Sequence, residues 1–348
     1  MRGRPTAARR ASAALFLFTL LAWASPSYAL DTVTISTFQG SFVALPLYVA
    51  KAYKLYEKHG LDAQFIYGTG IQPTNILVGG SANFGDFAIE HGINLIGKHQ
   101  DLKLLVVSQG ATPYSLIVRN DVPTPNLHKP YPQMLKDLKG LKLGVSTIGA
   151  GTDTMLRYLL SSAGISPSEV QILPVGGPQA QVAGIKNGSI DGAMSFEPAQ
   201  SEAVYGLHIA KMVLDMEGGQ GPEIFSDFAY NGVWSTGAYL KDHKKQAQEL
   251  VAAIVDAQKM INDPAETDKV VKVAVDNMHG IDPKLLRRYV VNYRQIYHPV
   301  ATPKQIEHVE TYLQGAKLLS HSIPYEKVVA TEVMPQKFSP SAHRAEGK

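Results

Sequence analysis

Residues 138–165 read LKGLKLGVSTIGAGTDTMLRYLLSSAGI, and this stretch decides the expected fold. Its apolar residues at 141–145 are typical of a buried strand, and the apolar spacing over 152–163 is typical of an amphipathic helix. The same alternation continues directly afterwards with strand 170–175, helix 179–186 and strand 192–196. Strands that alternate with helices favour βαβ units around a parallel sheet.

A similar set of elements precedes this one. Its patterns, in chain order, are strand 32–38, a helix over 45–56, strand 62–67, helix 74–78, helix 89–98 and strand 102–107. The second set begins with a strand at 115–119, and residues 120–132 hold four prolines that indicate an irregular connection. Two βαβ sets in tandem therefore predict two lobes.

Residues 238–334 carry a helical pattern. One apolar stripe within it consists of Leu250, Ile254, Ala257 and Ile261. We expect these helices to pack back on the first lobe, which the chain re-enters near residues 228–234. The chain then crosses between the lobes twice, near Tyr114 and near Phe228, and these crossings are the expected hinge.

These patterns predict an α/β fold with two lobes, each a mostly parallel sheet flanked by helices, and a ligand cleft between the lobes. The expected division is a signal peptide at 1–29, the first lobe at 30–115, the second lobe at 116–227, the return to the first lobe with the C-terminal helices at 228–338, and a flexible tail at 339–348.

The N-terminal residues have the pattern of a secretory signal peptide. Residues 1–29 carry four arginines and no acidic residue, then an apolar run at 11–23, then Ser27-Tyr28-Ala29. The apolar run is shorter than the roughly 20 residues that a membrane-spanning helix needs. We therefore expect cleavage after Ala29 and a periplasmic protein.

Charge and cysteine content exclude several classes of protein. Cleavage would change the balance from 33 basic and 30 acidic residues to 29 and 30, so the mature chain is near neutral and no nucleic-acid partner is expected. The chain has no cysteine, which rules out disulfides, thiolate chemistry and a lipid anchor at the cleavage site. A freely soluble monomer is the expectation.

Ligands of open α/β sheets bind at the carboxyl ends of the strands, where helix N-termini offer free N–H groups. Five turns occupy such positions, at 39–42, 85–87, 149–152, 176–179 and 196–198. From them, and from two aromatic residues near the crossings, the candidate ligand-binding residues are Gly40, Ser41, Phe42, Gly85, Asp86, Tyr114, Gly151, Thr152, Gln179, Phe196, Glu197 and Trp234.

Four segments carry a resemblance to a known family. They are LPLYVAKAYKLYEKHGLD at 45–62, GGSANFGDFA at 79–88, the stretch quoted first, and IKNGSIDGAMSFEPAQ at 185–200. Their order and spacing resemble the periplasmic binding proteins for sulfonates, taurine, nitrate and thiamine-pyrimidine precursors. The resemblance implies the two-lobed periplasmic-binding-protein-like fold and a solute-binding subunit that serves the membrane permease and ATPase of an ABC importer.

The resemblance also implies which turns touch the ligand. These are the turn after the first strand, the N-terminus of the first helix of the second lobe, and the aromatic-acid-proline turn. The residues that acquire ligand-facing roles in this way are Ser41, Phe42, Asp86, Gly151, Thr152 and Glu197.

Structural alternatives remain open for several candidates. Gly40-Ser41 can be a plain helix cap, and Asp86 can be a helix-start carboxylate that complements the dipole. Tyr114 and Trp234 can be core or hinge aromatics rather than ligand contacts.

Enzymatic and metal sites find no support in the sequence. Turn 149–152 lacks the third glycine of a dinucleotide loop and the lysine of a phosphate loop. No pair of histidines has zinc-ligand spacing, and no serine lies in a Gly-x-Ser-x-Gly motif. We expect no catalytic residue, no metal and no cofactor.

The ligand itself stays open between two classes. The candidate turns hold no Arg or Lys, so a small organic anion, such as a sulfonate, nitrate or aromatic acid, would be held by N–H groups and helix ends. The aromatic candidates can instead frame a pyrimidine, with Glu197 accepting from its amino group. A small organic anion is the favoured interpretation. A pyrimidine-synthesising enzyme and a ligand-sensing subunit are the alternatives, although the enzymes of that kind are rich in cysteine.

Overall fold

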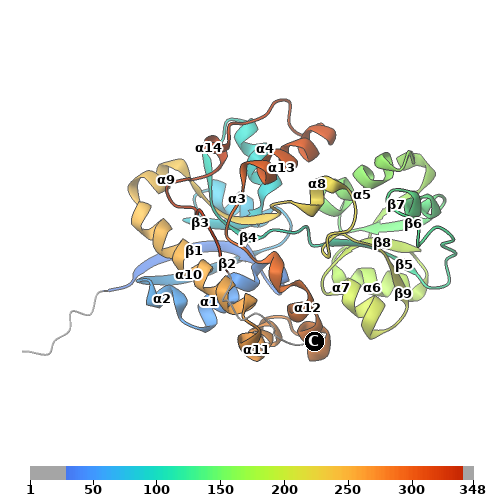
Figure 1. Cartoon of the computed structure of the whole chain (residues 1–348), viewed down its shortest axis with the longest axis horizontal. Helices are drawn as coiled ribbons and strands as arrows, with labels where there is room; N and C mark the ends of the chain where they lie inside the picture. The colour runs from blue at the N-terminus through green and yellow to red at the C-terminus, as the bar shows by residue number, and fades with distance from the viewer. Residues whose placement is uncertain (1–28, 340–348) are drawn as a thin grey trace, which may run out of the picture.

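The computed structural model describes residues 29–339, in which the chain forms two lobes side by side, each around a five-stranded sheet (Figure 1). The signal-peptide prediction and nearly all of the predicted tail lie outside the described residues. Within them, no helix combines the length and the apolarity that crossing a membrane requires.

The first-lobe sheet has the strand order β2-β1-β3-β10-β4. Its strands are β1 (Asp31–Phe38), β2 (Leu61–Gly68), β3 (Phe84–Ala88), β4 (Leu102–Gln109) and β10 (Asn231–Thr236). Strand β1 pairs in parallel with β2 and β3, whereas β10 runs antiparallel to both β3 and β4. Four strands therefore share one direction, and the strand that arrives from the second lobe opposes them.

The second-lobe sheet repeats this plan in the order β7-β6-β8-β5-β9. Its strands are β5 (Tyr114–Arg119), β6 (Lys142–Val145), β7 (Gln171–Pro174), β8 (Gly192–Phe196) and β9 (Ala210–Asp215). Strand β6 is parallel to β7 and β8, and β5 is antiparallel to β8 and β9. In this sheet, too, four strands share one direction, and the strand that opposes them follows a crossing between the lobes. The expected mostly parallel sheets are therefore confirmed.

Helices cover both sheets. In the first lobe they are η1 (Phe42–Ala44), α1 (Leu45–Ala52), α2 (Leu55–Lys58), α3 (Gln72–Val78) and α4 (Ile89–Gly97). In the second lobe and the return to the first they are η2 (Gln133–Leu138), α5 (Gly151–Ser162), η3 (Pro167–Glu169), α6 (Pro178–Asn187), α7 (Ala199–Ser201), the short π-helix η4 (Glu202–Gly206) and α8 (Glu223–Ser226).

Most of the C-terminal helices lie beside the first-lobe sheet (Figure 1). The C-terminal helices are α9 (Gly237–Asp242), α10 (Lys244–Asn262), η5 (Pro264–Glu266), α11 (Thr267–Asn277), α12 (Pro283–Tyr293), η6 (Arg294–Ile296), α13 (Pro303–Gly315) and α14 (Tyr325–Val328). The expected stripe of α10 is fully buried at Leu250, Ile254, Ala257 and Ile261, in one core with α1 and β1.

Two local predictions are wrong. The helix expected over 45–56 breaks into α1 and α2, because Lys54 has a left-handed backbone with φ of 53°. The turn expected at 85–87 is instead the middle of strand β3. All five residues of β3 are buried, so the strand lacks the polar alternation of a half-exposed strand, and its Gly and Asp imitate a turn.

Candidate functional site

The carboxyl ends of β3 and β6 bring one residue from each lobe together. Glu90 is the second residue of α4, which follows β3, and Gly151 is the first residue of α5, which begins beyond β6. A β-carbon at Gly151 would lie 3.5 Å from Glu90 Oε1 and would collide with Tyr114 Oη. Only glycine therefore leaves room at this point between the lobes.

Two tyrosines border this point where the chain crosses between the lobes. Tyr114 begins β5, and Tyr230 lies just before β10. Their hydroxyl oxygens are 2.8 Å apart, and their rings meet edge to face with centroids separated by 5.6 Å. Both side chains are buried, and burial raises the pKa of each phenol, so both are neutral at physiological pH. They supply neutral hydroxyls beside Glu90.

Glu90 is the unusual group of the site. It is 8% exposed, yet its carboxylate accepts no hydrogen bond from any group within residues 29–339. Its nearest basic neighbour is His91 Nε2 at 3.8 Å, and burial lowers the pKa of that imidazole to about 4, so it is uncharged at neutral pH. Burial alone raises the pKa of the Glu90 carboxyl to about 7.

The start of α5 is held by its own loop. Ser146 donates its backbone N–H to Thr152 Oγ1 at 2.9 Å, and Gly149 donates to Asp153 Oδ2 at 2.7 Å. The Thr152 side chain is 2% exposed, so its hydroxyl braces the turn rather than facing a ligand. Among the hydrogen bonds of residues 29–339, none uses the N–H groups of Gly151 or Thr152. These two donors are the part of the turn that can bind an anion.

A second group of buried acids, Glu197 and Glu217, links the second lobe to α12. Gln200 Nε2 donates to Glu197 Oε1 at 3.2 Å and to Glu217 Oε2 at 3.0 Å, and Tyr289 of α12 donates to Glu217 from the first lobe. Ser201 Oγ also donates to Glu197, at 2.7 Å. Burial raises the pKa of Glu197 to about 7 in spite of these donors, and it raises the pKa of Glu217 too.

Asp86 does not lie at a turn, which corrects its predicted position. The residue is fully buried in β3, where it accepts from Thr37 Oγ1 at 2.9 Å, Ser108 Oγ at 2.9 Å and Asn231 Nδ2 at 2.5 Å. These donors come from β1, β4 and β10, so the carboxylate ties the first-lobe sheet together. Gly85 beside it is equally enclosed, because a β-carbon there would lie 2.8 Å from Phe87 Cε1.

Trp234 lies in the core of the first lobe. Of the two roles left open by the sequence, core aromatic and ligand contact, the structure places it in the first. Its ring is fully buried and stacks on Phe87 with centroids 5.6 Å apart and planes within 4° of parallel. Such a ring has no face left for a ligand.

The candidate residues of the first turn, Gly40, Ser41 and Phe42, also have structural roles. Ser41 caps η1 by accepting from Val43 N at 3.3 Å, so the capping alternative holds for this side chain. Gly40 has a φ of 62°, which favours glycine. Phe42 is buried and stacks on Tyr289 with ring centroids 3.7 Å apart. The structure does not bring this turn into contact with Glu90.

The remaining candidates lie on the second lobe. Phe196 ends β8, is partly exposed and pairs with Tyr114 across the sheet. Gln179 is exposed near the start of α6 at the same sheet edge. The structure thus brings Gly151, Tyr114 and Phe196 close to one another and leaves Gln179 at the rim.

The residues of the Glu90 and Glu197 clusters that were not predicted from the sequence include Glu90, Tyr230, Glu217 and Tyr289. Only Glu90 had a usable signal. Had residues 84–88 been recognised as a strand, the rule that ligands bind beyond the carboxyl ends of strands would have placed Glu90 at such an end. The others meet through tertiary contacts between distant segments.

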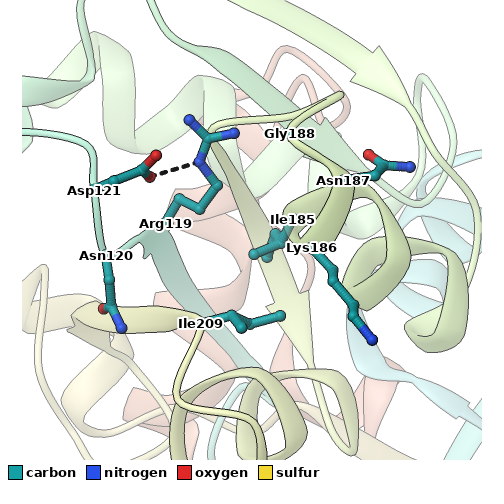
Figure 2. A pocket seen from close by; sticks show the side chains of 8 residues that line it. All are labelled: Arg119, Asn120, Asp121, Ile185, Lys186, Asn187, Gly188 and Ile209. Carbon is teal, nitrogen blue, oxygen red and sulfur yellow. Dashed lines mark hydrogen bonds and ion pairs between the residues drawn. The ribbon is translucent and has the colours of Figure 1, made fainter.

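A shallow hollow elsewhere on the second lobe is not a comparable site (Figure 2). It lies at the far end of β5, opposite the α5 turn, next to the last residues of α6. Its guanidinium, Arg119, is already bonded to Asp121 at 2.7 Å, as the dashed line in Figure 2 shows. Across residues 29–339, the acids and histidines form no group of three or more that could hold a metal ion.

Comparison with known proteins gives a family and one curated relative. The model of the NMT1-like family matches residues 32–275. The nitrate/nitrite binding protein NrtA of Nostoc sp. strain PCC 7120 is 24% identical over 144 residues, which are 41% of this chain and 31% of that protein. The match thus spans about a third of the length of this relative.

Solved structures agree on the fold. The periplasmic aliphatic sulphonate binding protein SsuA from Escherichia coli has a TM-score of 0.67 at 15% identity, over 87% of this chain and 98% of that chain. The desulfurization enzyme DSZB has a TM-score of 0.64 at 15% identity, over 87% of this chain and 97% of that chain. This two-lobed periplasmic-binding-protein fold therefore serves binding proteins and at least one enzyme.

Proposed function

Because the chain belongs to the NMT1-like family, we propose that it is the periplasmic solute-binding subunit of an ABC importer, which captures a small ligand between its lobes. The observation that carries this proposal is the meeting of Glu90, Gly151 and the Tyr114–Tyr230 pair at the ends of strands from both lobes. Convergent polar groups at a lobe boundary are the usual form of a small-molecule site.

The proposed lobes are residues 30–115 with 228–338, and residues 116–227. The chain passes between the two sheets after β4 and again after β9, which supports a hinge at these two segments. Ligand binding would close the lobes by rotation about them.

The proposed ligand carries an anionic group. The free N–H groups of Gly151 and Thr152, at the positive end of a 12-residue helix, would bind it. The names of the relatives, which bind nitrate and aliphatic sulphonate, are consistent with this class. A pyrimidine bound by Glu197 is less favoured, because Ser201 and Gln200 already donate to that carboxylate.

We propose binding rather than catalysis. Although DSZB is an enzyme with this fold, the present chain has no cysteine and therefore no thiolate nucleophile. A ligand-sensing subunit would use the same site. Import and sensing differ only in the membrane protein that the closed, ligand-bound form contacts.

The test is calorimetric titration of the chain from Leu30 with nitrate, ethanesulfonate, 2-aminoethanesulfonate, benzoate and 4-aminobenzoate. We expect at least one compound to bind, and Gly151→Ala to weaken it tenfold or more, since the new methyl group collides with Tyr114. Gly315→Ala is the matched control, because its β-carbon would have 3.7 Å to the nearest atom outside its own helix. Equal binding by Gly151→Ala and the wild type would contradict the proposed site.

A further inference from the structure

Helix α12 is anchored in the first lobe and also reaches the second lobe. Its Leu286 and Val290 are buried in one core with α1 and β1, and the ring of Tyr289 stacks on Phe42 with centroids 3.7 Å apart. The hydroxyl of the same tyrosine donates to the buried carboxyl of Glu217, which lies just after β9 of the second-lobe sheet. One side chain therefore connects the core of the first lobe with the end of the second-lobe sheet.

Two other side chains of α12 contact the second lobe directly. Tyr293 Oη donates to Asp215 Oδ2 at 3.1 Å, at the last residue of β9. The guanidinium carbon of Arg288 lies 3.4 Å from the centre of the Tyr205 ring in η4, which is a cation–π contact. A hydrogen bond is lost once its heavy atoms separate beyond about 3.5 Å. A rotation that moves the second lobe away from α12 therefore breaks these contacts.

The Glu197–Glu217 pair, which α12 contacts, has more acceptors than donors around it. A single amide group, Gln200 Nε2, donates to both carboxyls, at 3.2 Å and 3.0 Å. Gln109 Nε2 adds only a 3.5 Å contact to Glu217. The side-chain oxygens of Gln109 and Gln200 are buried, and neither accepts a hydrogen bond from any group within residues 29–339. A proton on either carboxyl supplies one more donor to this cluster, because a protonated carboxyl donates one hydrogen bond.

The groups around the pair leave the two carboxyls as the part of the contact that titrates near neutral pH. Asp215 of β9 adds a nearby carboxylate, and the guanidinium of Arg288 acts on Glu197 from α12. Three tyrosines also face the pair: Tyr289, Tyr293 and Tyr297. Burial raises the pKa of each phenol, so all three stay neutral up to pH 9. Burial also raises the pKa of Glu197 to about 7 and that of Glu217, on which the carboxylate of Glu197 acts in the same direction.

We propose that α12 and the Glu197–Glu217 pair form a proton-dependent latch, which holds the lobes together in the absence of ligand and weakens when the pair ionises. The carboxyls lose a proton more easily in water than in the buried contact, so ionisation favours an open arrangement in which water reaches them. The latch is therefore firm below about pH 7 and weaker above it. The inference rests on the proposed function in one respect, because it assumes that the lobes can open and close.

A further bridge between the C-terminal helices and the second lobe has no such pH dependence. Tyr312 of α13 donates its hydroxyl to Thr154 Oγ1 of α5 at 2.8 Å. Burial raises the pKa of this phenol well above its ordinary value, and a threonine hydroxyl does not titrate. A change of lobe separation near neutral pH is therefore assigned to the contact of α12.

The lobe separation can be measured with spin labels, because the chain has no cysteine of its own. Labels on Asn75→Cys in α3 and Lys186→Cys in α6, both exposed positions, report the distance between the lobes by double electron–electron resonance. Without ligand, the ratio of open to closed molecules should rise about tenfold or more from pH 6 to pH 9. About tenfold is the change for one carboxyl whose pKa is about 7 in the contact and 4.5 in water, and Glu217 adds to it. An unchanged ratio, with an unchanged radius of gyration of the unlabelled protein, would overturn the latch.

Two variants separate the charge from the hydrogen bond. Glu217→Gln removes the charge and keeps an oxygen that accepts from Tyr289, so its ratio should change with pH at most about threefold. Tyr289→Phe keeps the ring on Phe42 and removes the donor, so it should raise the open fraction already at pH 6. A pH response as large in Glu217→Gln as in the wild type would overturn the role of the pair. A closed Tyr289→Phe at pH 6 and pH 9 would overturn the role of α12.

Glu310→Gln and Tyr325→Phe are the matched controls. Burial raises the pKa of Glu310 as well, but its carboxyl accepts from Ile323 N within the C-terminal segment. The hydroxyl of Tyr325 donates to Ala301 O of the same segment at 2.7 Å. Both controls should open with pH as the wild type does, and loss of the response in either would overturn the assignment to α12.

Calorimetric titration tests the proposed function separately, since the latch is measured without ligand. Ligand binding by a protein whose lobe separation does not depend on pH would overturn the latch alone. A protein that neither binds any of the five compounds nor changes its lobe separation would count against the proposed function and the latch together.

Discussion

Replacing Asp86 by asparagine should make the ligand-free protein more stable at alkaline pH. Burial raises the pKa of Asp86 from 3.8 to about 7, although its three donors oppose this rise. At about 1.36 kcal/mol for each pH unit, the ionised carboxylate costs roughly 4 kcal/mol in the folded state. Because the folded pKa is raised, this group's contribution to stability is complete below about pH 4 and is lost as the pH rises through 7.

The variant keeps the network while losing the charge. The oxygen of the new amide can still accept from Ser108 and Asn231, and its nitrogen can donate to the hydroxyl of Thr37, which then turns its own proton away. The free energy of unfolding of the wild type relative to Asp86→Asn should therefore fall by roughly 3 kcal/mol between pH 4.5 and pH 8.

Urea unfolding followed by circular dichroism at both pH values measures this difference. Glu90, Glu197 and Glu217 also have raised pKa values, but they are present in both proteins and cancel. Asp31→Asn, at an exposed position of the same sheet, is the control, and its free energy of unfolding should change with pH as that of the wild type does. Parallel pH slopes for Asp86→Asn and the wild type would refute the raised pKa. Lower stability of Asp86→Asn at pH 8 would show that three donors more than offset the burial of the charge.

Three further outcomes are expected. Intact-mass measurement of periplasmic protein should give a chain that starts at Leu30, and a mass that includes residues 1–29 would contradict cleavage. Small-angle scattering should show a smaller radius of gyration with a saturating ligand, whereas an unchanged radius would remove the support for a hinge. Gly92→Ala should lower the free energy of unfolding by about 1–3 kcal/mol, because its β-carbon would collide with the Trp234 ring. The control Gly315→Ala should change the melting temperature little. Equal melting temperatures of the two variants would show that the tryptophan can move aside.

The sequence was most informative where patterns were long and local. The βαβ order, the start of α5 near Gly151 and the buried stripe of α10 all depend on periodicity or turn chemistry within one segment. Strand β3 was missed because a strand buried on both faces shows no alternation, and the partners that make Asp86 acceptable there come from three other strands.

The site was predicted less well for the same reason. Glu90 and Tyr230 are 140 positions apart, and their proximity depends on how two crossings align two lobes, which no local pattern records. Phe42 was expected at a ligand because it lies in the turn after the first strand, and Trp234 because it is an aromatic residue near a crossing between the lobes. In the fold, each ring is instead covered by another aromatic ring, Tyr289 and Phe87 respectively.

The position of β10 has a consequence for how the chain assembles. This strand lies between β3 and β4, although it is made more than 120 residues after them, whereas β5 to β9 of the second lobe are contiguous in the chain. The second lobe can therefore form its sheet as soon as it emerges, while β3 and β4 wait with unpaired edges for residue 231. During synthesis, the first lobe is thus the part of the nascent chain whose strand edges are open to edge-to-edge aggregation until β10 is made.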